Sequence, residues 1–262
     1  MSDSPIQEHE VVHALDAAYY TSEALYQKEC SGLFARTWQY AGHVSQVAKP
    51  GDYFSFDIAG QGLFCIRDSS NVLHTFYNVC QHRAHQLVSG QGEGKKTLVC
   101  PYHAWTYRLD GHLLRGPNTE VVPESVRESI CLTPVRTQEF CGFIFVNLDD
   151  NADPMEDWFP GVEAELREFV PRIDDLTPLE IIQAQERCNW KVSVENYSEC
   201  YHCRINHRTF STGVVKPDTY DIQPQGYCLR HTTECQNLEK MTYPIDLGAS
   251  EHAGDYSSWY LW

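Results

Sequence analysis

Short apolar or alternating runs, separated by turn sequences, fill the chain between Trp38 and about Asp150. A period of two between apolar residues is typical of strands that bury one face, and clusters of Gly, Pro, Asp and Asn are typical of the turns between them. We therefore predict a small antiparallel β-domain over residues 38–150. Its candidate strands are "WQYAGHV", "DYFSFDI", "GLFCIR", "VLHTFYNV", "TLVC" and "CGFIFVNL".

A helical period precedes this region. In "TSEALYQKECSGLFARTW", Leu33 and Phe34 fall on the apolar face, and Thr21 or Ser22 is placed to cap the first turn. We predict that residues 1–37 form a helical arm that packs with the last domain.

Residues 151–262, after the polar boundary "DDNADP", mix the two periods. "GVEAELREFV" has apolar residues at helical spacing, and "NWKVSVENYSECYHC" is predicted to be a helix over residues 189–203. Three runs are predicted to be strands: "LEIIQAQER" at residues 179–187, "YCLRHTTEC" and "SSWYLW". The pattern therefore predicts both helices and strands in residues 151–262.

The composition narrows the classes of protein that the chain can be. The formal net charge of −16 argues against a nucleic-acid surface, which needs clustered Lys and Arg, and is compatible with a cationic substrate or a basic partner. No apolar run approaches the ~18 residues that span a bilayer. The opening "MSDSPIQEHE" lacks the basic and apolar parts of a secretory signal, so we expect a cytoplasmic protein.

Eleven cysteines are an odd number in a chain of 262 residues without an export signal. Reduced thiols and metal ligands are therefore favoured over a disulfide framework. Cys80 and His82 form a C-x-H pair, and after seventeen intervening residues Cys100 and His103 form a C-x-x-H pair. Two thiolates and two imidazoles suit either a tetrahedral zinc or a Rieske [2Fe–2S] cluster. Pairs that each mix one Cys with one His favour the cluster, and a structural zinc is the alternative.

A second group of metal-binding residue types follows in "ENYSECYHCRINH". Glu199 and His202 are three residues apart, about 60° on a helix, and so share a face. His202 and His207 are about 140° apart on a regular helix and cannot both face one ion from it. Either the helix ends near Cys203, or it carries a bulge. Packing or solvent exposure of the two histidines is the alternative.

Around the first group, the sequence resembles the Rieske domain of the ring-hydroxylating oxygenases. "CQHRAHQL" and "CPYHAWTYRLDG" match the family's C-x-H-R, then C-P-x-H-x-W, then a D-G turn. The resemblance implies that Cys80 and Cys100 bind one iron and that His82 and His103 bind the other. The extra loop cysteines of respiratory Rieske proteins are absent, since Arg83 follows His82 and "PY" follows Cys100.

The same family carries N-W-K, then E-N, then (D/E)-x-Y-H-x₄-H, as residues 189–207 do here. This implies that His202 and His207 bind a mononuclear Fe(II), and that Glu199 links His202 to His103 of an adjacent subunit in a homotrimer. The third ligand in the family is a carboxylate about a hundred residues further on, and we expect it beyond Trp262. The acids at positions 246, 251 and 255 come too early.

The fold implied is α+β: an all-β Rieske [2Fe–2S] domain and the N-terminal part of a helix-grip (START/Bet v 1-like) catalytic domain, apparently truncated. Glu199 in place of the more common Asp resembles the carnitine and betaine monooxygenase branch. Tyr197 is a candidate contact for a quaternary ammonium ion. We interpret Cys200 and Cys203 as small apolar side chains, not ligands.

The function implied is that of the terminal oxygenase of a two-component system. It uses O₂ and electrons from a separate NAD(P)H-dependent flavin and iron–sulfur reductase to hydroxylate a quaternary ammonium substrate, which leads to C–N cleavage or N-demethylation. No G-x-G-x-x-G is present, in agreement with an external reductase. Two alternatives are an aromatic-ring dioxygenase α subunit and an electron-carrying Rieske protein without oxygenase activity.

Overall fold

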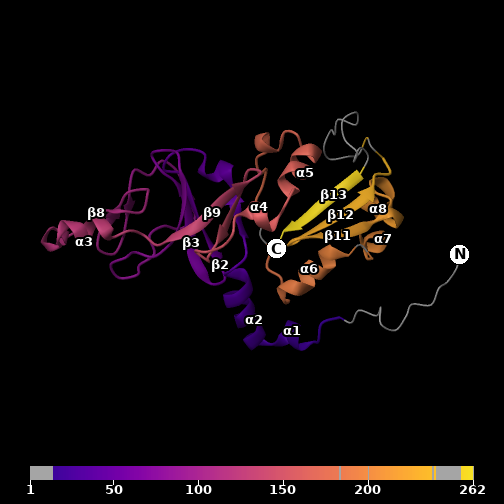
Figure 1. Cartoon of the computed structure of the whole chain (residues 1–262), viewed down its shortest axis with the longest axis horizontal. Helices are drawn as coiled ribbons and strands as arrows, with labels where there is room; N and C mark the ends of the chain where they lie inside the picture. Colours follow the sequence, from indigo (N-terminus) through magenta and orange to yellow (C-terminus); the bar gives the residue numbers. More distant parts are fainter. Residues whose placement is uncertain (1–13, 183, 200, 238, 240–254, 262) are drawn as a thin grey trace.

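A seven-stranded antiparallel sheet is the largest element of the chain, for which the computed structural model describes residues 14–182, 184–199, 201–237, 239 and 255–261. Its strand order is β1-β10-β9-β4-β3-β2-β5 (Figure 1). The strands are β1 (Gln39–His43), β2 (Tyr53–Ile58), β3 (Gln61–Arg67), β4 (Leu73–Tyr77), β5 (Gln91–Gly92), β9 (Pro134–Phe140) and β10 (Phe143–Asn147).

A second, three-stranded sheet lies beyond β4 and completes the β-domain. It has the order β6-β7-β8, with bounds Leu98–Val99, Thr106–Tyr107 and Leu113–Arg115. A short helix, α3 (Glu124–Ser129), follows it at one end of the molecule (Figure 1). All six strand candidates between residues 38 and 150 form strands, so the predicted antiparallel β-domain is confirmed. The sequence pattern missed β5, β7, β8 and β9.

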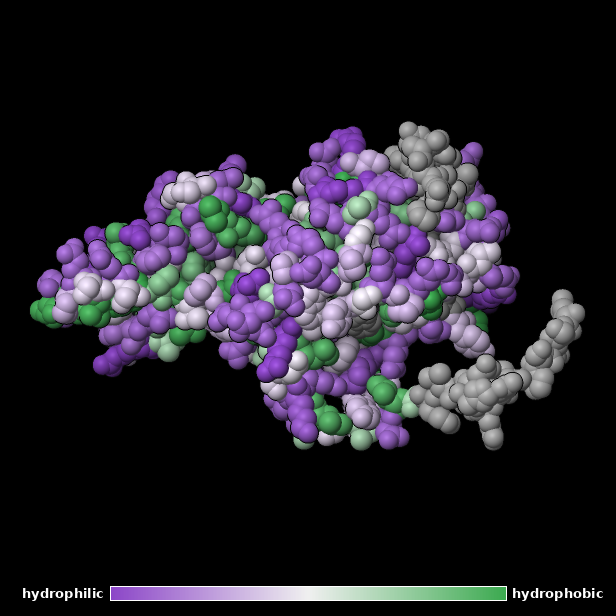
Figure 2. Space-filling model, viewed as in Figure 1, coloured by the Kyte–Doolittle hydropathy of each residue, from purple (hydrophilic) through white to green (hydrophobic). Residues whose placement is uncertain are grey.

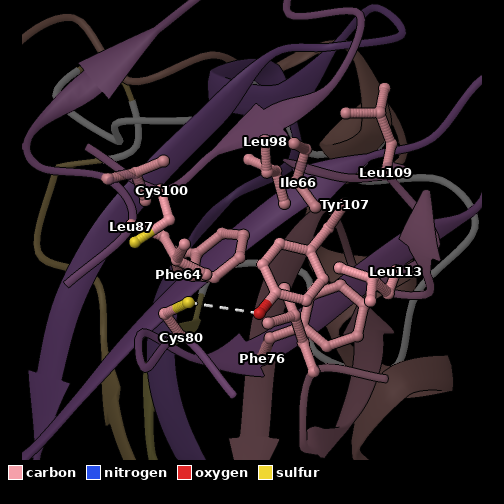
Figure 3. Close-up of a cluster of buried hydrophobic side chains, with 12 residues drawn as sticks. Phe64, Ile66, Phe76, Cys80, Leu87, Leu98, Cys100, Tyr107, Leu109 and Leu113 are labelled. Carbon is pink, nitrogen blue, oxygen red and sulfur yellow. Dashed lines mark hydrogen bonds between the residues drawn. The ribbon is translucent and has the colours of Figure 1, made fainter. Parts of the chain in front are cut away.

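The two sheets of the β-domain enclose a dry core of aliphatic and aromatic side chains (Figure 3). The core includes Phe64 and Ile66 of β3, Phe76 of β4 and Tyr107 of β7, each 2% exposed or less. Cys80 and Cys100, the two cysteines of the first metal pattern, lie in the same core. The loops after β4 and β6 are therefore tied together through buried side chains.

The N-terminal arm consists of α1 (Ala18–Thr21), α2 (Glu23–Glu29) and a π-helical turn over Cys30–Phe34. Ser22 caps α2, because its hydroxyl accepts the backbone N–H of Leu25 at 3.4 Å. The arm lies against the start of α6, with the Phe34 and Trp190 rings edge to face at 5.2 Å.

The rest of the chain is the α+β part. Its three-stranded antiparallel sheet has the order β11-β12-β13. The strands are β11 (Asp221–Gln225), β12 (Cys228–Glu234) and β13 (Asp255–Leu261), and the helices are α4 (Met155–Trp158), α5 (Val162–Phe169), α6 (Trp190–Ser198), α7 (Cys203–Asn206) and α8 (Arg208–Gly213). Short 3₁₀ turns cover Val44–Val47, Thr119–Val121, Ile173–Asp175 and Pro217–Thr219.

Two predictions in this part were wrong. The run at 179–187 forms no strand in its described residues, and Leu179, Ile181 and Ile182 are 102%, 60% and 80% exposed. A strand needs a neighbour for its backbone hydrogen bonds, and no described segment pairs with this run. The helix predicted over residues 189–203 ends at Ser198, because Glu199 is extended (φ −135°, ψ 149°), and α7 begins only at Cys203.

A second dry core joins the large sheet to the α+β part. Phe140 and Phe145 of the sheet, and Trp38 just before β1, pack with Phe159 and with Cys228 of β12. Phe159 is 1% exposed, and its ring lies 6.4 Å from that of Phe140. The two parts of the molecule therefore share buried surface.

Phe159→Ala should destabilise the protein by about 3–5 kcal/mol, because it leaves a cavity in this shared core. Urea or guanidinium unfolding of the purified protein would measure the change. Val121→Ala, at a side chain that is 81% exposed, is the matched control and should change stability by less than about 0.5 kcal/mol. Equal stability of the two variants would show that the core is not shared as described.

Candidate metal centres

Two loops with nearly the same backbone carry the first metal pattern. In each loop a cysteine N–H donates to the carbonyl five residues later, from Cys80 to His85 at 2.9 Å and from Cys100 to Trp105 at 2.7 Å. The matched hydrogen bonds place Cys80 and Cys100 at equivalent positions. In each loop the thiol therefore lies in the core, and the residues that follow lie nearer the surface.

An alanine closes each loop in the left-handed region, Ala84 at φ 55° and Ala104 at φ 57°. Both donate their N–H to the carbonyl of the cysteine four residues earlier, at 2.9 Å. Left-handed backbone is uncommon for residues other than glycine and is found more often where function demands a particular loop shape. Its repetition in the two loops marks them as a matched pair.

The thiols of the pattern lie inside and the imidazoles lie outside. Cys80 and Cys100 are each 2% exposed and belong to the same buried core. Burial raises the pKa of Cys80, and the neighbouring Cys100 raises it further, against the lowering effects of Tyr107 and a backbone N–H. The imidazole rings of His82 and His103 are 4.8 Å apart, centroid to centroid.

His103 has one buried atom without a partner. Its Nδ1 makes no hydrogen bond. A buried ring nitrogen without a hydrogen bond is costly unless it binds a metal or another ligand. The pKa of His103 is lowered by loss of hydration and by nearby positive charge, so the ring is in the neutral form that a metal requires.

The four side chains form two pairs instead of surrounding one point. Among the described residues, no three His, Cys, Asp or Glu side chains are grouped to hold a single ion. A structural zinc needs four ligands around one centre. A [2Fe–2S] cluster needs one pair at each of two irons, which agrees with a buried thiol pair and a more exposed imidazole pair. The residues present therefore fit the cluster.

Tyr107 touches the thiol pair from within the core (Figure 3). Its hydroxyl lies 3.2 Å from the Cys80 Sγ and accepts the Gln81 N–H at 3.0 Å, which leaves its own hydrogen to be donated to the sulfur. Burial, and then the bond to Cys80, raise the Tyr107 pKa well above its usual range. Tyr107 therefore stays protonated and remains a donor to that sulfur.

Aromatic rings cover both histidines of the cluster pattern. Trp105 stacks on His82 with centroids 4.8 Å apart and an angle of 7° between planes, and Tyr102 lies over His103 at 3.8 Å. Space for the indole exists because residue 116 is glycine: a Cβ there would lie 2.7 Å from the Trp105 ring. These rings limit how the two imidazoles can turn.

The second pattern lies where α6 ends. Glu199 is the extended residue after the helix, and its Oε1 accepts the Nδ1–H of His202 at 2.9 Å. The His202 and His207 rings lie 5.1 Å apart, although a regular helix could not bring them together. Glu199 and His202 thus form a carboxylate–histidine pair, and the ring of His207 lies beside the ring of His202.

Glu199 is held in its ionised form. The hydrogen bond from His202 lowers the pKa of Glu199, and the Tyr201 N–H adds to this effect against some loss of hydration. Since Nδ1 of His202 carries the hydrogen, Nε2 holds the free lone pair and would face a metal. A cavity of about 540 Å³ lies on the Glu199 side, lined by Tyr201, Arg204, Tyr220 and others.

Comparison with known protein families matches both parts of the chain. Residues 37–126 match the Rieske [2Fe-2S] domain, and residues 173–253 match the catalytic domain of the ring-hydroxylating α subunit. A curated relative, the carnitine monooxygenase oxygenase subunit of Escherichia coli (strain K12), is 40% identical over 200 residues, which are 76% of this chain and 54% of the relative.

The chain belongs to the Rieske oxygenases.

Two further similar proteins are Rieske oxygenases of the quaternary ammonium branch. The glycine betaine monooxygenase oxygenase subunit of Pseudomonas aeruginosa (strain UCBPP-PA14) is 32% identical over 74% of this chain and 44% of its own length. The solved structure of a quaternary ammonium Rieske monooxygenase, described for carnitine oxidation by gut microbiota and inter-subunit electron transfer, has a TM-score of 0.82 and 32% identity, and covers 94% of this chain and 65% of that one. The chain spans about half the length of the curated relatives it matches.

The remaining candidate residues are distributed as follows. Tyr197 is on α6, 66% exposed, with its ring 6.2 Å from that of Tyr260. Asp255 begins β13 opposite Glu234, and the other two early acids lie outside the described residues. In the part of the chain that the structure describes, no helix is long and apolar enough to cross a membrane.

The expectation of reduced thiols needs one correction. Nine described cysteines are free, but Cys203 is buried and disulfide-bonded, so it is not a simple apolar side chain. A disulfide sulfur is not a thiolate, and Cys203 therefore does not compete for iron. Cys200 lies outside the described residues.

Sequence reasoning missed Tyr107, Trp105 and Tyr102 as parts of the cluster site. All three stand inside "CPYHAWTYRLDG", and Tyr102 and Trp105 flank the predicted ligand His103 directly or one residue away. Tyr107, on β7, contacts Cys80, which is 27 residues away in the sequence. No spacing rule predicts that contact.

Tyr107→Phe should lower the reduction potential of the cluster without removing it. The hydroxyl donates to a sulfur that becomes more negative on reduction, so its loss destabilises the reduced form. A difference of about 1.4 kcal/mol in that hydrogen bond corresponds to roughly 60 mV for one electron. Redox titration followed by the low-temperature resonance signal of the reduced cluster would measure the change.

Tyr53→Phe is the control, because Tyr53 packs against the same core. The reduction potential of the cluster in Tyr53→Phe should equal that in the unsubstituted protein. An unchanged potential in Tyr107→Phe would contradict the assigned direction of the Tyr107 hydrogen bond.

Proposed function

We propose that the full-length protein is the oxygenase component of a two-component system that hydroxylates a C–H bond beside a quaternary nitrogen. The reaction consumes O₂, two electrons and two protons, and yields the hydroxylated substrate and water. When bound, the cluster would supply single electrons and the mononuclear Fe(II) would supply O₂ activation. The resulting hydroxylated carbon beside nitrogen breaks down by C–N cleavage or loss of a methyl group as an aldehyde.

Cys80, His82, Cys100 and His103 would hold the cluster, and the loop geometry supports this assignment. The buried thiol pair is shielded from solvent, whereas His82 is exposed and His103 is partly exposed. Electron transfer needs a close approach to the cluster, and the imidazole end is the accessible one. The Tyr107 hydroxyl and the stacked Trp105 would hold the two ends in place.

His202 and His207 would be two of the three ligands of the mononuclear iron. Glu199 orients His202 through the Nδ1 hydrogen bond to Oε1, and its Oε2 accepts the backbone N–H of Tyr201. That carboxylate side chain is 47% exposed, and so can accept a further hydrogen bond from outside the chain. The third ligand would be a carboxylate beyond the residues of this chain.

The pocket beside His82 and His103 is also lined by residues between β8 and α3, whereas His202 and His207 flank α7. The distance between these elements favours transfer between subunits. β8 and α3 mark one end of the long axis, and α7 and α8 mark the other (Figure 1). A head-to-tail contact would bring His103 of one subunit to Glu199 of the next, and repeated contacts of this kind close into a ring. We propose that the ring is a homotrimer; the number of subunits is what the resemblance to the ring-hydroxylating oxygenases implies, and the head-to-tail contact is compatible with it.

Exposed apolar side chains accompany both ends of that contact. Val121 is 81% exposed beside the imidazole end, and Tyr201 and Ile205 are 89% and 69% exposed beside Glu199. Figure 2 shows hydrophobic patches over the β8 and α3 end. Apolar patches on a soluble surface often mark interfaces. A separate NAD(P)H-dependent reductase would then deliver electrons to the assembled ring.

The substrate class is supported by the relatives, which act on carnitine and glycine betaine. A quaternary ammonium ion donates no hydrogen bond and is recognised by aromatic faces and negative charge. Tyr197 would contribute one such face, since it is exposed and lies two residues before Glu199.

The full-length enzyme, supplied with a reductase and NAD(P)H, should convert at least one trimethylammonium compound such as carnitine, a betaine or choline. Product formation by mass spectrometry, with O₂ consumption measured in parallel, tests the proposal. Conversion of arenes but of no trimethylammonium compound would establish the aromatic dioxygenase alternative. His202→Ala should retain a reducible cluster and lose product formation, whereas an electron carrier would be unaffected by that change.

In the same assay, Tyr197→Leu should raise KM more than Tyr197→Phe, because only Phe keeps an aromatic face. Equal KM values in both variants would remove Tyr197 from the substrate site without affecting the reaction class.

Glu199→Gln in the full-length enzyme should slow the transfer of electrons from the cluster to product by about ten- to a hundredfold, because the charged acceptor of the His202 hydrogen bond is lost. Single-turnover experiments starting from reduced cluster would measure the rate. The exposed Glu180→Gln is the control. A Glu199→Gln enzyme with the unaltered rate would contradict the role of Glu199 as the link between the centres.

A further inference from the structure

One carboxylate of the N-terminal arm holds the start of the helix that leads to Glu199. The two oxygens of Glu29 accept from two consecutive residues of α6: Oε2 from the Trp190 indole at 2.8 Å, and Oε1 from the Lys191 ammonium at 2.5 Å. A second arm contact follows one turn later, where the Tyr20 hydroxyl donates to Glu195. Lys191 and Glu195 are four residues apart and so share the face of α6 toward the arm.

The Glu29–Lys191 pair is shielded from water. The Lys191 side chain is 10% exposed, and that of Glu29 is 18% exposed. Burial alone would raise the pKa of Glu29, but the hydrogen bonds from Lys191 and Trp190 outweigh it and lower that pKa. Removal of one partner from a buried ion pair leaves the other charge uncompensated, which is strongly unfavourable.

Besides the Glu29 pair and the Tyr20–Glu195 hydrogen bond, the Lys191 ammonium lies 5.9 Å from the centre of the Tyr20 ring. A cavity of about 610 Å³ lies between the arm and α6, lined by Tyr20, Glu23, Trp190 and others. The apolar contact between Phe34 and Trp190 lies beside the same helix turn as the carboxylate. The described contacts of α6 with the arm are therefore a few specific ones within its first six residues. Its last turn is held separately, where the Tyr260 hydroxyl donates to the Tyr197 carbonyl at 3.0 Å.

α6 transmits that orientation to the iron-binding residues. Asn189 caps the helix by accepting the Lys191 N–H at 3.1 Å, and Glu199 follows its last residue. Nine helical residues extend over about 13 Å as a stiff rod. A tilt at the first turn displaces Glu199, and with it the ring of His202 that Glu199 holds.

We propose that Glu29 is a positioning residue for the reaction: it clamps Trp190 and Lys191 and so sets where Glu199 and His202 stand relative to the electron donor. This inference rests on the proposed function. It assigns the N-terminal arm a part in electron transfer between the centres, although the arm contributes no iron ligand.

The test uses the full-length enzyme with its cluster and iron in place. Glu29→Ala removes the charge and both hydrogen bonds, and Glu29→Gln keeps the size and one acceptor oxygen. Glu23→Gln is the matched control, since Glu23 is on the same helix and accepts instead from Gln27 of the arm. Three quantities are measured: the resonance signal of the reduced cluster, the single-turnover rate of product formation, and hydrogen–deuterium exchange of residues 190–198.

We expect an unaltered cluster signal in every variant. Glu29→Ala should lower the single-turnover rate at least tenfold and speed exchange in α6, Glu29→Gln should show a smaller loss, and Glu23→Gln should show none. Full rates in both Glu29 variants would overturn the proposal. If Glu29→Ala fails to fold, Glu29→Gln decides: an unaltered rate and unaltered exchange in α6 would overturn it.

The outcome also separates this proposal from the proposed function. If the unsubstituted enzyme converts no trimethylammonium compound, the proposed function is wrong. The role of Glu29 is then tested only by the rate of hydrogen–deuterium exchange in α6. If the unsubstituted enzyme is active and the Glu29 variants match it, only the clamp fails.

Discussion

The division of four side chains into a buried thiol pair and an exposed imidazole pair is the constraint from which the rest of the β-domain follows. Each loop has to turn its cysteine inward and, two or three residues later, its histidine outward. The matched backbone hydrogen bonds and the left-handed Ala84 and Ala104 achieve this in both loops. The large sheet and the small sheet then enclose the cysteines. The packing of the core therefore also determines the position of the redox centre.

Much of this could be predicted from the chain itself. The alternating runs between Trp38 and Asp150 predicted six strands, and the mixed Cys and His pairs predicted the kind of centre. The loop alanines were not predictable, because a left-handed alanine has no distinctive residue type. Tyr107 and Glu29 were missed for another reason: each acts on a residue distant in sequence, through contacts that only the fold creates.

The two wrong secondary-structure predictions have different physical causes. Residues 179–187 have the apolar pattern of a strand, but a strand exists only with a neighbour to accept its backbone hydrogen bonds. Helix spacing alone suggested that α6 continues to residue 203, whereas the extended Glu199 ends it at Ser198. That early end frees His202 and His207 from helical geometry and lets their rings approach each other. The division of the chain at residues 37 and 150 stays a prediction.

The shared core around Phe159 affects how this molecule can be taken apart. Phe140 and Phe145 belong to the large sheet, yet they are covered by Phe159 and Cys228 from the other part of the chain. A fragment cut at residue 150 would expose these aromatic faces to water and would tend to self-associate. An isolated electron-transfer module made from this protein would therefore need polar side chains in place of these aromatic ones. Because the two halves share this surface, a substitution on one half also changes the packing of the other.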